Sequence, residues 1–422
     1  MTSDTVYEEA YVWVWLPGRT EPVVAGLLSR SGRQLVFNYG RSYLARDDRI
    51  SLYLPELPLE TGIIPLLPGL DMPSCIRDAS PDAWGRRVII NRKLGLKGEG
   101  AESIELDELT YLMESGSDRI GALDFQASPT NYVPRQRRSA SLAELLQSAD
   151  RVEAGVRLHP ELDQALQHGT SLGGARPKAL VDTEERHYIA KFSASRDLYN
   201  VVKAEYVAMR LGALVGLSFA PVRLVQAMDK DVLLVERFDR IHTETGWARR
   251  SMVSALTLFG LDEMMAPYAS YEVLAELIRH RFANPARDLR ELFARLSFNI
   301  LCGNTDDHAR NHAAFWDGTH LDLTPAYDVC PQSRIGNEAS QAMLISGTNR
   351  MSRLASVLEA APNFLLDPYE AKEIISGQIK TMRERWTPVC DEAGLTETDR
   401  LLLWGRQFFN PYAFEGLDDE FG

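Results

Sequence analysis

The feature that most constrains the fold is a predicted β-hairpin inside a region that otherwise has helical periodicity. Two apolar runs, AAFW and THLDL, flank Asp317-Gly318. An Asp-Gly pair between apolar runs is a strong signal for a tight hairpin turn, because its residues tolerate positive φ. The hairpin directly follows NTDDHARN at 304–311, and its second strand leads to Asp328. The fold must therefore place a polar loop, a hairpin and another carboxylate in direct succession.

The hydrophobic pattern divides the chain into three expected regions. Residues 1–140 contain short alternating runs and then a polar, proline-bearing linker, which is typical of a β-rich unit. Residues 141–245 combine a glycine-rich turn, buried strand-like runs and a helix, and residues 246–422 are mostly helical. This order predicts an α+β protein.

Bulk properties exclude several classes of protein. The 422 residues, 45% hydrophobic and 25% charged, are ordinary for a soluble globular chain of two or three structural units. A net charge of -13 argues against a broad non-specific surface for nucleic acid. The four cysteines form no CxxC pair, so we expect neither a zinc ribbon nor a disulfide framework. The N-terminal stretch is acidic where a signal peptide would be basic, and no apolar run could span a membrane, so a cytoplasmic protein is expected.

The polar loop contains two adjacent carboxylates, Asp306 and Asp307, which are costly to bury without a cation or a function. Protein kinases use an Asp followed five positions later by an Asn, where the Asp orients the acceptor hydroxyl and the Asn binds Mg²⁺. Asp306 and Asn311 have this spacing, whereas Asp307 does not. The spacing occurs often by chance, so it carries weight only with other features.

A glycine-rich stretch and a lysine come earlier in the chain. HGTSLGGARPK at 168–178 could cradle a phosphate with backbone N–H groups, although a purely structural turn explains its glycines as well. Lys191 lies in the apolar run YIAKF, where a lysine must reach the surface or meet an anion. Glu205, on the following helix, is a candidate ion-pair partner for this lysine or an ordinary solvated residue.

The order of these features is more informative than any one of them. A phosphate loop, a strand lysine, the Asp306/Asn311 pair and Asp328 after a hairpin follow one another as in phosphoryl-transfer enzymes. Oxygen ligands from Asn311 and Asp328 suit Mg²⁺, which takes its other ligands from water and phosphate. The sequence therefore favours phosphoryl transfer.

Two rival sites fit less well. His308 and His312 would share one face of a helix, as in zinc hydrolases, but Ala309 replaces the glutamate of that motif. His308 is better explained by hydrogen bonds to backbone that fix the loop. Ser171 could be a hydrolase nucleophile, but it lacks the G-x-S-x-G elbow.

These motifs resemble the HipA family, bacterial serine/threonine kinases that act as toxins of toxin–antitoxin pairs. GLLSRSGRQLVFNYGRSYL, ISLYLPELPL and SPDAWGRR look like the family's N-terminal region. SLGGARPKA is similar to its phosphate loop, NTDDHARNHA to its catalytic stretch and LTPAYDV to its metal-binding segment. The resemblance implies a two-lobed protein-kinase-like fold with an N-terminal β-rich subdomain (1–140), an ATP-binding lobe (141–245) and a mostly helical C-terminal lobe (246–422).

The resemblance also implies a role for individual residues. Asp306 would be the catalytic base, Asn311 and Asp328 would bind Mg²⁺, and Ser171 would be autophosphorylated to silence the kinase. Glu236 and Phe238, in VERF at 235–238, would lie at the hinge that meets adenine. The residues expected to contact ATP are Ser171, Gly173, Gly174, Ala175, Lys178, Lys191, Glu236, Phe238, His308, Arg310, Asn311 and Asp328.

By resemblance, the chain would use ATP and Mg²⁺ to phosphorylate a host protein of translation, such as an aminoacyl-tRNA synthetase, and arrest growth. Its partner would be a HipB-like helix-turn-helix antitoxin that contacts operator DNA, with a homodimer inside the complex and no membrane association. A catalytically weak binding module or co-repressor, and a small-molecule kinase, are the alternatives.

Two residues depart from the family pattern. Asp307 stands where the family has glycine, and Arg310 stands where it has lysine. Arg310 keeps the charge but changes the hydrogen-bond geometry. The extra carboxylate of Asp307 could bind a second cation, but we expect it to face water.

Overall fold

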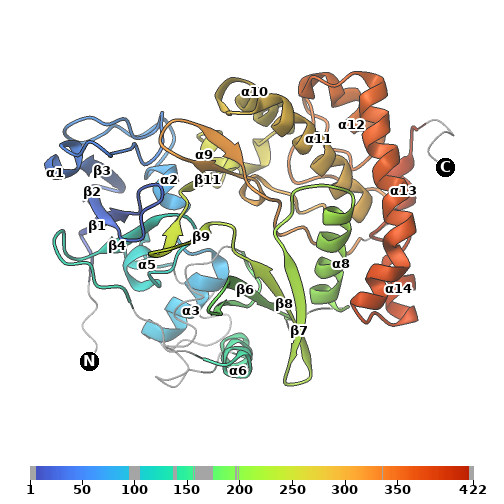
Figure 1. Ribbon diagram of the computed structural model, residues 1–422, viewed down its shortest axis with the longest axis horizontal. Coiled ribbons are helices and arrows are strands. Elements are labelled where there is room, and N and C mark those ends of the chain that lie inside the picture. Colours follow the sequence, from blue (N-terminus) through green and yellow to red (C-terminus); the bar gives the residue numbers. More distant parts are fainter. Residues whose placement is uncertain are drawn as a thin grey trace. The chain divides into compact units, whose positions relative to one another are not determined.

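The computed structural model describes residues 6–94, 105–135, 140–154, 156, 174–194, 197, 199–334 and 336–417. The chain forms two compact units from interleaved segments (Figure 1). The first unit comprises Met1–Arg196, Val225–Val253 and Trp316–Thr319, and the second comprises Asp197–Leu224, Ser254–Phe315 and His320–Gly422. The division into regions 1–140, 141–245 and 246–422 stays a prediction.

The first unit begins with an antiparallel sheet in the order β3-β2-β1-β4. The strands are β1 (Glu9–Val14), β2 (Val23–Ser31), β3 (Gln34–Tyr39) and β4 (Leu123–Gln126). The meander expected from the alternating runs is thus present, with a fourth strand from much later in the chain. The short helices that accompany it are α1 (Arg41–Leu44), α2 (Ser74–Arg77), α3 (Ala83–Leu94) and α5 (Glu108–Glu114).

A second sheet, in the order β5-β6-β8-β7, carries the strand lysines. Its strands are β5 (Lys178–Asp182), β6 (His187–Phe192), β7 (Val222–Ala227) and β8 (Lys230–Glu236), followed by the ribbon of β9 (Arg240–Thr243) and β10 (Gly246–Arg249). Helix α6 (Leu142–Glu153) starts with a capping box between Ser141 and Glu144. One apolar core joins α3, α6 and this sheet, formed by Trp84, Val88, Leu145, Leu146, Ala149, Val152, Ala179, Tyr188, Ala190, Phe192, Val232 and Leu234.

The second unit is mainly helical. Its α-helices are α8 (Val201–Leu214), α9 (Ala255–Leu258), α10 (Tyr271–Arg281), α11 (Pro285–Cys302), α12 (Leu354–Ala360), α13 (Pro368–Glu392) and α14 (Glu397–Leu403). Helix α13 starts with a capping box between Asp367 and Glu370, and it packs against α8 and α11 (Figure 1). Its buried apolar side chains recur every three or four residues, as an amphipathic helix requires: Ala371, Ile375, Ile379, Met382, Trp386 and Val389.

Helix α11 ends where the candidate catalytic loop begins. Its C-cap is Gly303, with φ of +74°. A Cβ at this position would lie 2.5 Å from the backbone oxygen of Gln407, so glycine is needed for both conformation and space. The chain can therefore turn sharply from a buried helix into the polar loop.

All four cysteines are free and buried. Among the described residues, no helix combines the length and apolar character needed to cross a bilayer.

Candidate active site

The candidate catalytic loop runs from Asn304 to Asn311, between α11 and the strand β12 (Ala313–Trp316). Its last three residues form a 3-10 turn, in which the Asn311 backbone N–H donates to the His308 carbonyl at 2.8 Å. The Asn311 side chain is nearly buried, and its Nδ2 donates to the backbone oxygen of Asp306 at 3.1 Å. Because the amide nitrogen is engaged in this way, the Asn311 Oδ1 is directed elsewhere and is suited to a metal.

The predicted hairpin follows the loop. Strand β12 pairs with β13 (Leu321–Leu323), and Gly318 between them has φ of +100°. The Thr319 N–H donates to Asp317 Oδ1 at 2.7 Å, which stabilises the turn. The prediction of a hairpin around Asp317-Gly318 is confirmed.

Beyond the hairpin, the chain returns to the catalytic loop. Tyr327 donates its hydroxyl to the backbone oxygen of Arg310 at 2.7 Å. The next residue, Asp328, has φ of +57°, an uncommon conformation for a residue other than glycine. Such backbone outliers concentrate at functional sites, where surrounding contacts hold them in place.

Electrostatics also place Asp328 beside Asp306. Asp306 is exposed as a residue, but neighbouring atoms partly shield its carboxyl from water, and this desolvation is the main cause of its raised pKa; His308 lowers the pKa, and the negative charges of Asp328 and Asp307 raise it further. Carboxylates that raise one another's pKa form a region of negative potential, which a divalent cation would neutralise. Asn311 contacts the backbone of Asp306, and the charge of Asp328 acts on the Asp306 carboxyl; a shared site of the three residues stays a prediction.

Asp307 does not face water, so the expectation for this residue is wrong. Its side chain is 2% exposed, accepts a hydrogen bond from the Tyr271 hydroxyl and forms an ion-pair contact of 3.0 Å with His312 Nε2. Burial alone would raise the pKa of Asp307, but His312 and the hydroxyl of Tyr271 bring it below its usual value. Adjacent residues in an irregular loop point in different directions, which explains why Asp306 is exposed and Asp307 is not.

The zinc interpretation is not supported. His308 precedes the 3-10 turn and His312 follows it, so they do not share a helix face. His312 instead pairs with Asp307. The loop is fixed by the backbone N–H and carbonyl of His308, whereas its ring Nδ1 has no hydrogen-bond partner among the described residues. Arg310 forms an ion pair of 3.1 Å with Glu263.

The candidate phosphate-binding residues lie in the first unit, on β5 and β6. Lys178 and Lys191 are direct partners in the antiparallel register, and they are only 4% and 9% exposed. Side chains opposite one another share a face of the sheet, and like charges in that arrangement are unfavourable. Two largely buried lysines thus share one face of the sheet.

The described part of the glycine-rich stretch is tied to this face. Gly174 has φ of +96°, a conformation that favours glycine, and a Cβ there would displace the flexible end of the Lys178 side chain. Its N–H donates to Asp82 Oδ2 at 2.7 Å. Ala175 next to it is exposed. Ser171 and Gly173 lie outside the described residues.

The predicted hinge residues lie at the end of β8 and directly after it. Glu236, the last residue of that strand, is paired with Tyr188 of β6, and its carboxylate meets Arg186. Phe238 is partly buried in the bend that follows. In the second unit, Glu205 is 3% exposed, so its interpretation as a solvated helix residue is wrong; its pairing with Lys191 stays a prediction.

A buried cluster of charges directly after the hinge escaped the sequence analysis. Arg237 and Arg240 both bind Asp118, at 3.0 and 2.6 Å, and both bind Asp239, at 2.8 and 2.9 Å. Arg237 also donates to the backbone oxygen of Arg119 at 2.7 Å. The cluster thus connects the segment before β4 to the hinge strand, both within the first unit. Its one signal in the sequence is the run of alternating charges RFDR after an apolar strand.

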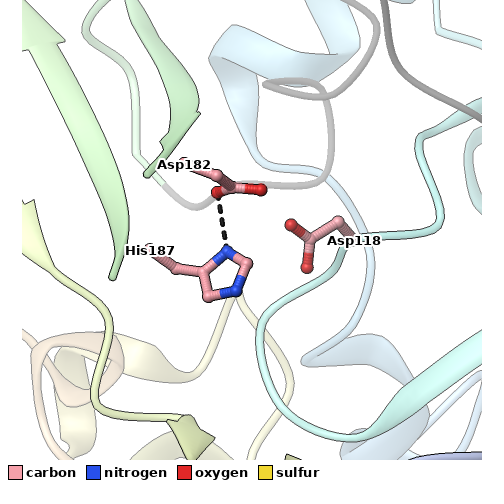
Figure 2. Close-up of side chains that lie close together, drawn as sticks. All are labelled: Asp118, Asp182 and His187. Carbon is pink, nitrogen blue, oxygen red and sulfur yellow. Dashed lines mark ion pairs between the residues drawn. The ribbon is translucent and has the colours of Figure 1, made fainter. Parts of the chain in front are cut away.

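Asp118 also lies near Asp182 and His187 (Figure 2). Among the described residues, this is the one group of three or more His, Cys, Asp or Glu side chains whose ligand atoms are close enough together for a metal. His187 Nδ1 lies 2.7 Å from Asp182 Oδ1. Because two arginines already bind Asp118, a cation there would be repelled, and we assign this group to the ion cluster.

Comparison with known proteins agrees with this arrangement. The model of the HipA-like C-terminal domain matches residues 170–386, and that of the HipA N-terminal domain matches residues 14–126. The serine/threonine-protein kinase toxin HipA of Shewanella oneidensis is 27% identical over 242 residues, covering 51% of this chain and 54% of that protein. The protein Y4mE of Sinorhizobium fredii is 32% identical over 131 residues, covering 30% of this chain and 31% of that protein.

A solved structure shows the same fold over nearly the whole chain. It belongs to the complex of HipA, HipB and operator DNA from the Shewanella oneidensis MR-1 toxin–antitoxin system, with a TM-score of 0.66, 18% identity, and coverage of 96% of this chain and 99% of that one. The predicted α+β, HipA-like fold is confirmed by this match. The matched segments span about a third to half the length of the two relatives named above. Since the HipA-like C-terminal domain alone accounts for half of the sequence, the chain belongs to the HipA family.

Proposed function

We propose that the protein is an ATP-dependent serine/threonine protein kinase acting as the toxin of a HipA/HipB-type pair. The observations that carry the proposal are the hydrogen bond from the Asn311 side chain to the backbone of Asp306 and the raised pKa of the Asp306 carboxyl, to which partial burial contributes most and the charge of Asp328 adds. A loop and a post-hairpin segment of the second unit would thus supply three oxygen-bearing side chains to one site.

The donor set fits Mg²⁺. A carboxylate from Asp328 and the amide oxygen of Asn311 are hard oxygen ligands, and Mg²⁺ commonly takes only one or two such ligands from protein. When bound, the ion would neutralise charge on the transferred phosphate. Asn311 and Asp328 would hold it, and Asp306, the exposed carboxylate, would orient the acceptor hydroxyl and take its proton.

The first unit would hold the nucleotide. Lys178 and Lys191 would meet the phosphates through charge-assisted hydrogen bonds, which are stronger than neutral ones. The backbone around Glu236 and Phe238 would meet adenine. His308 and Arg310 would complete the ATP contacts from the catalytic loop, together with Gly173, Gly174 and Ala175 of the glycine-rich stretch.

The toxin role includes three finer proposals. The substrate would be a host protein of translation, such as an aminoacyl-tRNA synthetase, and phosphorylation of Ser171 would silence the enzyme by adding nearly two negative charges to the phosphate loop. A HipB-like antitoxin would bring the complex to operator DNA, which fits a net charge of -13 on this chain. A homodimer would form inside that complex.

The test is phosphate transfer by purified protein with radiolabelled ATP and Mg²⁺, followed by mapping of phosphopeptides. We expect incorporation at Ser171 and into a protein of the translation machinery, and loss of both in Asp306→Asn. Asp307→Asn is not an equivalent control, because Asp307 is buried in a network of its own; Asp317→Asn, at the exposed hairpin turn, is the matched acid-to-amide control. A protein that binds ATP and transfers no phosphate would refute the kinase and favour a binding module.

Growth arrest after expression separates a toxin from a metabolic enzyme. We expect arrest with the wild-type chain and normal growth with Asp306→Asn at equal protein level. Arrest that persists in Asp306→Asn would refute the role of Asp306. Phosphate on a small molecule, with no protein labelled, would refute the proposed class of substrate.

A further inference from the structure

The buried carboxylate of Asp307 connects the middle of the catalytic loop to His312, the residue that follows the loop. Asp307 follows Asp306, and His312 follows Asn311. The contact of 3.0 Å between Asp307 Oδ1 and His312 Nε2 therefore closes a ring of chain, residues 307–312, which contains Asn311 and directly follows Asp306. Both partners are nearly inaccessible to solvent, at 2% and 3% exposure, so water hardly competes for the contact.

Tyr271 attaches this ring to the helical unit. Its hydroxyl donates to Asp307 Oδ2 and lies 3.2 Å from His312 Nε2, while its ring meets the His312 ring edge to face at 5.3 Å. Tyr271 is the first residue of α10, and its own N–H donates to the Leu344 carbonyl at 2.8 Å. The side chain is fully buried, so its orientation is set by packing on all sides.

Such a buried network is costly unless every bond is made. A carboxylate without solvent needs donors for its oxygens, and here each oxygen of Asp307 has one. A carboxylate that served only solubility would lie on the surface, whereas Asp307 is buried. The network gives the loop one conformation, with the backbone of Asp306 and Asn311 held from both sides.

We infer that Asp307, Tyr271 and His312 form a clamp that fixes the separation of the catalytic base and the metal ligand, with Asp307 as a positioning residue. The inference rests on the proposed kinase function and deepens it. Asp307 touches neither ATP nor the acceptor; it acts through Asp306 and Asn311. Loss of the clamp would leave nucleotide binding by the first unit intact and would impair the transfer step.

The mildest test is Tyr271→Phe, which removes one hydroxyl from the network and keeps the ring. Tyr412→Phe is the matched control: Tyr412 is also buried in the second unit, and its hydroxyl has no hydrogen-bond partner among the described residues. We expect kcat to fall roughly 10- to 100-fold in Tyr271→Phe, because small displacements of reacting groups have effects of this size. KM for ATP should stay within about twofold, and the Mg²⁺ concentration for half-maximal rate should rise.

A second measurement does not depend on catalysis. Hydrogen exchange of peptides covering 304–312 should be faster in Tyr271→Phe and in Asp307→Asn than in wild type and Tyr412→Phe, since the His308 and Asn311 amides are bonded within the loop. Unchanged exchange there, or an unchanged kcat in an active enzyme, would overturn the clamp. Faster exchange in Tyr271→Phe than in wild type, combined with a wild-type chain that transfers no phosphate, would support the clamp as a structural device and refute the kinase proposal separately.

Discussion

Replacing Asp239 by asparagine should destabilise the first unit strongly. Asp239 is the anion at the centre of the cluster after the hinge, and its side chain is 3% exposed. It accepts hydrogen bonds from Arg237 Nε at 3.0 Å and Nη2 at 2.8 Å, from Arg240 Nη1 at 2.9 Å and from the Gly121 N–H at 2.7 Å. Asparagine keeps the shape but removes the charge, and its amide nitrogen would face donors.

Two arguments give the expected loss in the free energy of unfolding. Burial would raise the pKa of Asp239, but Arg237 and Arg240 hold it at about 2, compared with an ordinary value of 3.8. A pKa difference of nearly two units corresponds to roughly 2 to 3 kcal/mol of stabilisation at neutral pH. Removing one member of a buried ion pair costs about 3 to 5 kcal/mol, because the remaining charges are left uncompensated. We therefore expect a loss of about 3 kcal/mol for Asp239→Asn.

Urea unfolding followed by tryptophan fluorescence measures this loss, and hydrogen exchange of β1, β2 and β8 assigns it to the first unit. Asp48→Asn is the matched control, because Asp48 belongs to the same unit and pairs with Arg46 at 2.9 Å, with a side chain that is 37% exposed. Exposed pairs contribute about 0 to 1 kcal/mol. If Asp239→Asn were no less stable than Asp48→Asn, the cluster would not stabilise the fold and the reasoning would be refuted.

Three further outcomes follow. Because the folded-state pKa of Asp239 lies below its unfolded value, its contribution is fully present above about pH 4 and is lost as the pH falls toward about 2; acid titration of unfolding should show this dependence in wild type and a flatter curve in Asp239→Asn. Gly303→Ala should lower the free energy of unfolding by at least about 2 kcal/mol, because the positive φ disfavours alanine and its Cβ would collide with the Gln407 carbonyl. A melting temperature within a degree of the wild-type value would contradict this. Lys191→Met should weaken ATP binding by about tenfold or more while leaving the fold intact, because it removes one positive charge from the face shared with Lys178. Calorimetric titration with ATP measures the affinity. An affinity equal to that of wild type would exclude Lys191 from the phosphate site.

The sequence predicted the parts of the site whose residues are close together in the chain. The spacing of Asp306 and Asn311, the Asp-Gly turn and the carboxylate after it are local patterns; the structure confirms the turn and bonds Asn311 to Asp306, while the role of these residues as one site stays a prediction. The burial of the neighbouring carboxylate, Asp307, could not be predicted in the same way. Its partner Tyr271 lies 36 residues upstream, and no local pattern links the two.

The ion cluster after the hinge was missed for the same physical reason. Asp118 and Arg237 are 119 residues apart in the chain and meet only because two separate segments of the first unit pack together. Charge pairs of this kind follow from tertiary packing, whereas periodicity and turn signals follow from neighbours. The helices and strands were therefore easier to predict than the buried charges between them.

The hairpin tip has a consequence for how the chain is made. Trp316–Thr319 belongs to the first unit, where Trp316 Nε1 donates to the Ser51 carbonyl at 2.8 Å and its ring meets Tyr53. A ribosome therefore synthesises the catalytic loop before it supplies the last piece of the N-terminal unit. Until then, apolar surface around Tyr53 lacks its cover, and a nascent chain in this state is prone to association with other chains. The first unit is therefore completed only after the loop bearing Asp306 has been made. A prematurely terminated chain that ends before residue 316 has neither a finished first unit nor Asp328.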